Sequence, residues 1–299
     1  NMLRALGDSR TPVIFLVVSS LGNVALDLLF IVPMKMGVAG AAIATVIGQI
    51  VAGTAACIIN LKANTEIHLR IKGFRPDGKI IGLIYEVGIP SIIMQSIGSV
   101  MTYGMNKILL GFSSTAAAVF GVYFKLQSFI FMPVFGLNNG MVPIIAYNYG
   151  AGKRERMMKT LKLSILYAVI LMLIGFLVFQ VMPDSLLGLF DASETMLAIG
   201  RPALRIISIS FLLAGFSIVC GSMFQALGNG VYSMLVSIAR QLIVLLPVAY
   251  LLSRTGNIDM VWWAFPIAEL VSGGLTIFFL VRIYRNVIVH ISEPEHETA

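Results

Sequence analysis

The chain has 299 residues, of which 58% are hydrophobic and only 12% are charged. A water-soluble domain has about 25% charged residues, so this composition, with a mean hydropathy of +0.92, excludes a soluble enzyme and predicts an all-α polytopic membrane protein. The two cysteines, Cys57 and Cys220, lie inside apolar runs. They can supply neither a disulfide framework nor a four-ligand metal site.

Eight stretches of the chain are long and apolar enough to cross a bilayer, since each helical crossing needs about 20 largely apolar residues. Clusters of Gly, Pro and charged residues separate these stretches and indicate turns. The eight helices are expected at 12–33, 37–61, 80–111, 116–148, 160–182, 197–225, 231–252 and 260–281.

Basic residues are strongly biased to one side of this eight-helix topology. The side opposite the start of the chain holds Lys35, Arg201 and Arg254. The starting side holds fourteen: Arg4, Arg10, Lys62, Arg70, Lys72, Arg75, Lys79, Lys153, Arg154, Arg156, Lys159, Lys162, Arg282 and Arg285. Because basic loop residues resist translocation, the starting side and both chain ends are expected to be cytoplasmic, in a multi-pass protein of the plasma or inner membrane. The net charge of +7 then reflects contact with the lipid bilayer, and no nucleic-acid partner is expected.

An internal repeat relates the start of the chain to its last third. The turn at 5–8 (ALGD) returns 221 residues later at 226–229 (ALGN), and each copy precedes an apolar span. The next span also repeats, because the segment ending in Gln49 aligns with the segment ending in Glu269 at an offset of 220. Both copies start on the same side of the membrane, which is typical of transporters with two equivalent halves.

The repeat predicts how the chain is divided. Residues 1–61 are expected to be the last two helices of an N-terminal lobe, 62–79 a cytoplasmic linker, 80–283 a C-terminal six-helix lobe and 284–299 a cytoplasmic tail. Since the second copy has six crossings, the first should have six as well. The chain is therefore expected to be the remainder of a twelve-helix, two-lobe protein, with four upstream helices as its partners.

Four motifs resemble one transporter family. Residues 3–12 (LRALGDSRTP) are similar to the turn before the fifth helix of multidrug and toxic compound extrusion (MATE) transporters. Residues 88–90 (GIP), 124–133 (FKLQSFIFMP) and 148–152 (NYGAG) resemble its seventh and eighth helices. The resemblance implies an antiporter of two six-helix lobes that exports cationic amphipathic compounds in exchange for Na⁺ or H⁺, with no other cofactor.

Asp27 is the acidic residue that packing explains least well. It lies deep inside an apolar span, where an unpaired carboxylate costs several kcal/mol. Asn23 is one helical turn earlier, about 6 Å along the axis, so the two side chains can converge. Their counterparts in the second repeat are Val244 and Val248, so the same helix in the second half needs neither polar group.

Thr45, on the next span, adds a hydroxyl where the second repeat has Phe265. Carboxylate, amide and hydroxyl oxygens suit an alkali cation, and the carboxylate could instead carry a proton. The family resemblance implies the same assignment, because some members bind a cation or proton with an Asn and an Asp four residues apart and a Thr on the next helix. Asn23, Asp27 and Thr45 are therefore the expected Na⁺ or H⁺ site. A buried, hydrogen-bonded Asp27 that only fixes helix packing is the alternative.

A second-lobe cation site, which other family members have, is not expected. The approximate counterparts here are Gly98 and Ala214, whose side chains offer no oxygen. Glu269 lies in the middle of its span and is a candidate for a functional role, but Arg240 could equally neutralise it as a structural partner.

Eight polar, charged or aromatic side chains are candidates to line a substrate cavity, although residues of this kind also form ordinary interhelical contacts. Lys125 is the least easily dismissed, since it lies well inside its span; snorkelling to the interface is the alternative. The candidates are Tyr103, Asn106, Lys125, Gln127, Asn138, Asn139, Tyr147 and Glu269.

Two other functions were weighed against drug export. A lipid-linked oligosaccharide flippase would need more intramembrane basic residues to bind diphosphates. An intramembrane enzyme would need a catalytic cluster, but the sequence has no His-Glu-x-x-His motif and only three histidines, all outside the apolar spans. The chain is not expected to be an enzyme.

Overall fold

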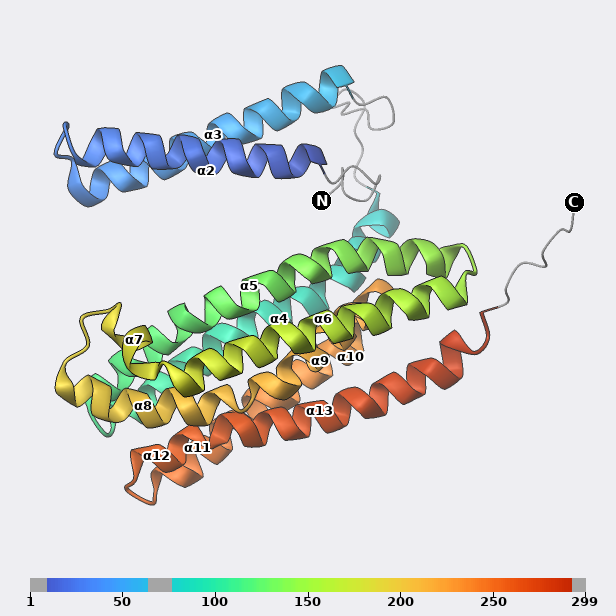
Figure 1. The fold of residues 1–299 in the computed structure, drawn as a ribbon. Coiled ribbons are helices and arrows are strands. Elements are labelled where there is room, and N and C mark those ends of the chain that lie inside the picture. Colours follow the sequence, from blue (N-terminus) through green and yellow to red (C-terminus); the bar gives the residue numbers. More distant parts are fainter. Residues whose placement is uncertain (1–9, 64–76, 292–299) are drawn as a thin grey trace, which may run out of the picture. The chain divides into compact units, whose positions relative to one another are not determined.

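A computed structural model describes residues 10–63 and 77–291, and these form two compact units, 1–78 and 79–299. The repeated turn at 5–8, most of the expected linker and residues 292–299 lie outside the described residues. Figure 1 shows the helices of each unit.

The first unit is an antiparallel hairpin of α2 (Arg10–Ile31) and α3 (Gly37–Ala63), which lie side by side (Figure 1). A short turn joins them, in which Lys35 and Gly37 both take positive φ angles. The hydroxyl of Ser19 on α2 donates to the carbonyl oxygen of Gly48 on α3 at 3.3 Å. The two helices therefore face each other along the stretch that contains the expected ion site.

The second unit is a bundle of helices. Its long members are continuous apolar helices joined by short turns, and several spans are built from two or three segments. The segments are α4 (Gly78–Leu110), α5 (Ser114–Gly150), α6 (Arg154–Val181), α7 (Pro183–Gly188), α8 (Glu194–Ser208), α9 (Phe211–Ala226), α10 (Gly230–Ile238), η1 (Ala239–Leu245), α11 (Leu246–Ser253), α12 (Ile258–Trp262), α13 (Ala264–Ile283) and η2 (Tyr284–Ile288).

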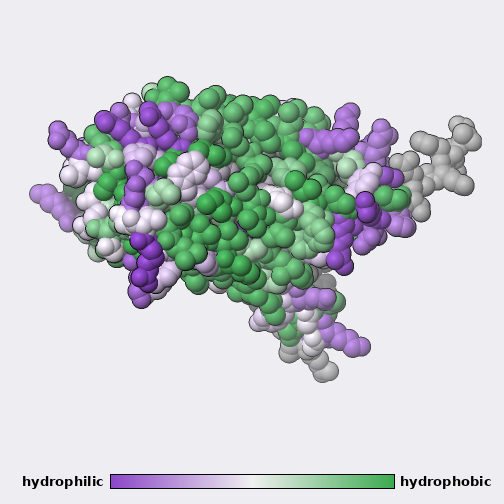
Figure 2. Space-filling view, turned by 90° about the horizontal axis from the view of Figure 1, so that it is seen from below, coloured by the Kyte–Doolittle hydropathy of each residue, from purple (hydrophilic) through white to green (hydrophobic). Residues whose placement is uncertain are grey.

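Within the described residues, seven helices are long and apolar enough to cross a membrane, and the bent pair of α8 and α9 supplies an eighth. Figure 2 shows apolar side chains over the middle of the visible face and hydrophilic ones gathered towards its two ends. Such a band is what hydrocarbon requires of the protein surface. The prediction of an all-α polytopic protein with about eight membrane-spanning helices is confirmed.

The sixth and seventh expected spans depart from regular α-helix. The sixth expected span is bent by 50° between α8 and α9. There the hydroxyls of Ser208 and Ser210 donate to the carbonyl oxygens of Arg205 and Ile207, and such local bonds compete with the helical ladder. The seventh span contains a π-helical segment, η1, between α10 and α11. Neither irregularity was expected from the sequence.

The last helix is longer than expected. After α13 the chain continues as the π-helical segment η2 through Ile288, whose side chain is fully buried. Residues 284–288 therefore belong to the folded lobe and not to the tail that was predicted to begin at 284.

Aromatic side chains fill the centre of the second unit. Phe211 on α9 packs edge to face against Phe131 on α5 and Phe179 on α6, with ring centroids 5.2 Å apart in each case. Tyr123 on α5 makes a similar contact with Phe265 on α13 at 5.9 Å. Pairs of this kind contribute about 0.5–1.5 kcal/mol beyond the area that they bury. They hold α5, α6, α9 and α13 around one core.

Close packing of α9 on α6 depends on Gly215. A Cβ atom at this position would lie 2.9 Å from the carbonyl oxygen of Ala168, which is backbone and cannot rotate away. A Cβ at Gly274 on α13 would meet nothing within 4 Å. We therefore expect Gly215→Ala to destabilise the protein by about 1–3 kcal/mol, as overpacking does. Gly274→Ala should be neutral or slightly stabilising, since it only restricts the unfolded chain. Thermal unfolding in detergent checks this, and equal melting temperatures for the two variants would contradict it.

Candidate functional site

The residues expected to bind the coupling ion meet between α2 and α3. The hydrogen bonds around Asn23 decide which atom of its amide is nitrogen and which is oxygen, as is usual for this side chain. In the orientation that satisfies both its ends, its nitrogen donates to Oδ2 of Asp27 at 3.2 Å and its oxygen accepts from the backbone N–H of Thr45 at 3.1 Å. The Thr45 hydroxyl donates to the carbonyl oxygen of Ala41 at 2.9 Å. The sequence spacing thus brings all three side chains together.

Asp27 keeps one oxygen without a partner. Its Oδ1 is buried and has no hydrogen bond, whereas Oδ2 accepts from Asn23. An unpartnered carboxylate oxygen is costly in an apolar environment. The charge of Asp27 is not offset by a salt bridge within the described residues. A cation or a proton at Oδ1 would remove both costs.

The second unit contains a pocket between several of its spans. Its wall combines aromatic rings with polar groups from five spans. The lining residues are Met101, Tyr123, Phe124, Gln127, Phe131, Ser210, Ala214, Arg240, Gln241, Leu245, Phe265, Ala268 and Glu269.

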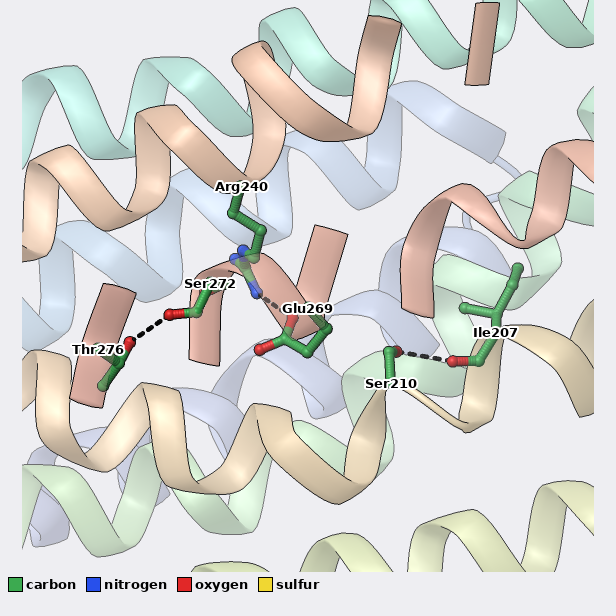
Figure 3. A network of polar contacts seen from close by, with 6 residues as sticks. All are labelled: Ile207, Ser210, Arg240, Glu269, Ser272 and Thr276. Carbon is green, nitrogen blue, oxygen red and sulfur yellow. Dashed lines mark hydrogen bonds and ion pairs between the residues drawn. The ribbon is translucent and has the colours of Figure 1, made fainter. Parts of the chain in front are cut away.

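An ion pair stands in the wall of this pocket. Nη1 of Arg240, in η1, donates to Oε2 of Glu269, on α13, at 3.2 Å, and the two side chains point toward each other (Figure 3). The Glu269 side chain is only 6% exposed and that of Arg240 is 31% exposed. Of the two alternatives for Glu269, neutralisation by Arg240 is therefore what the structure shows. The other carboxylate oxygen, Oε1, is buried without a partner.

The predicted cavity residues divide into two groups. Gln127 and Glu269 line the pocket, whereas the other six do not. Among these six, Asn138 is buried with both amide atoms unpartnered, and Asn106 is half-buried. The exposed ones are Tyr103, Lys125, Asn139 and Tyr147. The ammonium of Lys125 lies 5.7 Å from the ring centre of Phe190. A cavity role for these six residues stays a prediction.

Several pocket residues were not anticipated. Gln241 and Ser210 reach the pocket from η1 and from the break between α8 and α9. Tyr123 lies one helical turn before Gln127 on α5, and both line the pocket. This four-residue spacing is the signal in the sequence that could have identified Tyr123 as a pocket residue.

Comparison with known proteins places the chain in a family. The MatE family model matches residues 90–251. The multidrug export protein MepA of Staphylococcus haemolyticus is 29% identical over 289 residues, covering 96% of this chain and 63% of that protein. The chain thus spans somewhat less than two-thirds of this relative's length.

Solved structures give the same result. A MATE family transporter in an outward-facing conformation superposes with a TM-score of 0.84 at 24% identity, over 95% of this chain and 64% of that one. The MATE multidrug transporter DinF-BH superposes with a TM-score of 0.80 at 34% identity, over 90% of this chain and 60% of that one. These relatives are named as transporters and export proteins, in keeping with the expectation that the chain is not an enzyme. Together with the family match over more than half of its residues, these likenesses show that the chain belongs to the MatE family of membrane transporters.

Proposed function

We propose that the protein is a secondary active antiporter that exports cationic amphipathic compounds, and that Na⁺ or H⁺ binds at Asp27 to drive the exchange. One observation carries the proposal: Asp27 is held by Asn23 beside Thr45, yet keeps a buried carboxylate oxygen with no partner. A purely structural Asp would be expected to satisfy both oxygens. The internal repeat supports it, because the equivalent helix in the second half has valines at both positions.

The names of the relatives support export as the activity, since they are a multidrug export protein and MATE transporters. The bias of basic residues supports a multi-pass protein of the cell membrane with both chain ends in the cytoplasm. Its partners are then the lipid bilayer, the exported compounds and the rest of a two-lobe transporter.

Flipping of a lipid-linked oligosaccharide is less well supported. A diphosphate headgroup needs cationic side chains that are free to bind it. Among the described residues that line the pocket, Arg240 is the one cation, and it is already paired with Glu269.

Replacement of Asp27 by Asn is expected to abolish ion-driven export while leaving membrane insertion intact. The amide has nearly the same shape but can neither hold a cation's charge nor take up a proton. Asp191→Asn is the matched control, because Asp191 is exposed in a loop and Asn tolerates its positive φ. Resistance of cells to cationic drugs and drug uptake into inverted vesicles measure the effect. Export by Asp27→Asn at the rate of the control would contradict the coupling role.

The hydroxyl of Thr45 provides a test for the identity of the ion. If export depends on Na⁺, Thr45→Val should raise the Na⁺ concentration for half-maximal export about tenfold, because one oxygen ligand to a charged group contributes on the order of 1.4 kcal/mol. Ser19→Ala removes a hydroxyl that donates from α2 to α3, about two turns from Asp27, and should leave that concentration unchanged. If export follows pH and not Na⁺, the proton is the coupling ion and neither variant should alter the dependence. Equal shifts in both variants would rule out a ligand role for Thr45.

A further inference from the structure

We infer that the pocket of the second unit is a binding site for uncharged aromatic molecules that carry an adjacent hydrogen-bond donor and acceptor, such as an aryl amide. This goes beyond the proposed function, which concerns a cation or proton at Asp27 and positively charged substrates. Binding to the pocket can be measured without transport or an ion gradient, so each proposal can fail alone.

The charge of the pocket determines which ligand it favours. Among the described residues of its wall, Arg240 and Glu269 alone carry a formal charge, and they neutralise each other. A ligand with a net charge would give the site an uncompensated charge in an environment of low dielectric constant, which is unfavourable. An uncharged ligand avoids this cost. The pocket therefore differs from the site at Asp27, where the carboxylate is not offset by an ion pair among the described residues.

The ion pair leaves hydrogen-bonding capacity of both kinds. Oε1 of Glu269 is buried without a partner and accepts hydrogen bonds only. Glu269 lines the pocket, and each oxygen of an ionised carboxylate can accept two hydrogen bonds, so its Oε2 can accept another beside that from Arg240. The guanidinium of Arg240 has five N–H donors, of which one bonds to Glu269. A ligand N–H can thus donate to Glu269 while its carbonyl oxygen accepts from Arg240.

The rest of the wall suits an aromatic ring. Phe124, Phe131 and Phe265 supply aromatic faces and edges, and Gln127 and Gln241 supply further amide groups. These groups suit a flat aromatic molecule that carries one amide.

Three probes of matched shape test the inference: 2-naphthamide, which is neutral, 2-naphthoate, which is an anion, and 2-naphthylmethylammonium, which is a cation. Binding is measured by equilibrium dialysis with the purified full chain in lipid nanodiscs. Ala214 lines the pocket and is buried, so Ala214→Leu fills the space without touching the ion pair. We define pocket binding as the difference in bound probe between the unmodified protein and Ala214→Leu. This difference excludes binding elsewhere on the protein and partition of the probe into lipid.

For this pocket binding we expect naphthamide to bind at least tenfold more tightly than either ion. Glu269→Gln removes the negative charge and leaves Arg240 unneutralised, so the preference should change to naphthoate by at least tenfold. Lys159→Met removes an exposed cation outside the pocket and should leave the order of the three probes as it is.

Three results would overturn the inference. The first is that the unmodified protein binds the cation or the anion more tightly than naphthamide. The second is that Ala214→Leu binds as much naphthamide as the unmodified protein, and the third is that a folded Glu269→Gln protein keeps the preference for naphthamide. If Glu269→Gln does not fold, the order of the three probes in the unmodified protein and their loss in Ala214→Leu still decide the question.

Discussion

The constraint on which this structure depends is that a polar or ionised group inside hydrocarbon must have a partner. The backbone meets it by forming helices, in which nearly every N–H and C=O is bonded within the same segment. Side chains meet it in two different ways in the two units. Glu269 is paired with Arg240, whereas Asp27 has a neutral partner, Asn23, and no ion pair among the described residues. The first arrangement compensates the charge of the carboxylate within the protein, and the second leaves it uncompensated.

The internal repeat makes this difference informative. Aligned at the offsets of 221 and 220, Arg240 corresponds to Ser19 and Glu269 to Gln49. In the first half Ser19 only donates to the carbonyl oxygen of Gly48, and the acidic residue stands two turns further along α2. The two halves therefore keep the same pair of helices but place their polar groups at different depths. Polar groups that differ in charge and in position along equivalent helices can bind different ligands without a change of fold.

The sequence predicts what depends on composition and regular spacing. Long apolar segments fix the number of spans, and the four-residue interval from Asn23 to Asp27 brings these side chains together because a helix turns once in about 3.6 residues. It does not predict the break at Ser210 or the π-helical segment at Arg240, since both depend on which carbonyl oxygens the neighbouring groups reach in three dimensions. Gln180, for example, donates to the carbonyl oxygen of Arg205 from another helix. Conversely, a list of polar residues on helices cannot tell which of them face one pocket, and of eight candidates only Gln127 and Glu269 do.

The two irregularities both supply residues to the wall of the pocket in the second unit. Closely packed regular helices leave little space between them, because their side chains interdigitate. Here the break between α8 and α9 brings Ser210 to the pocket wall, and the wider turn of η1 brings Arg240 and Gln241 to the same wall. π-helical turns often occur at functional sites, where the extra residue would otherwise cost stability. The ion pair between η1 and α13 offsets part of that cost by tying the irregular turn to a regular helix. The same contact that neutralises Glu269 thus also fixes one wall of the pocket.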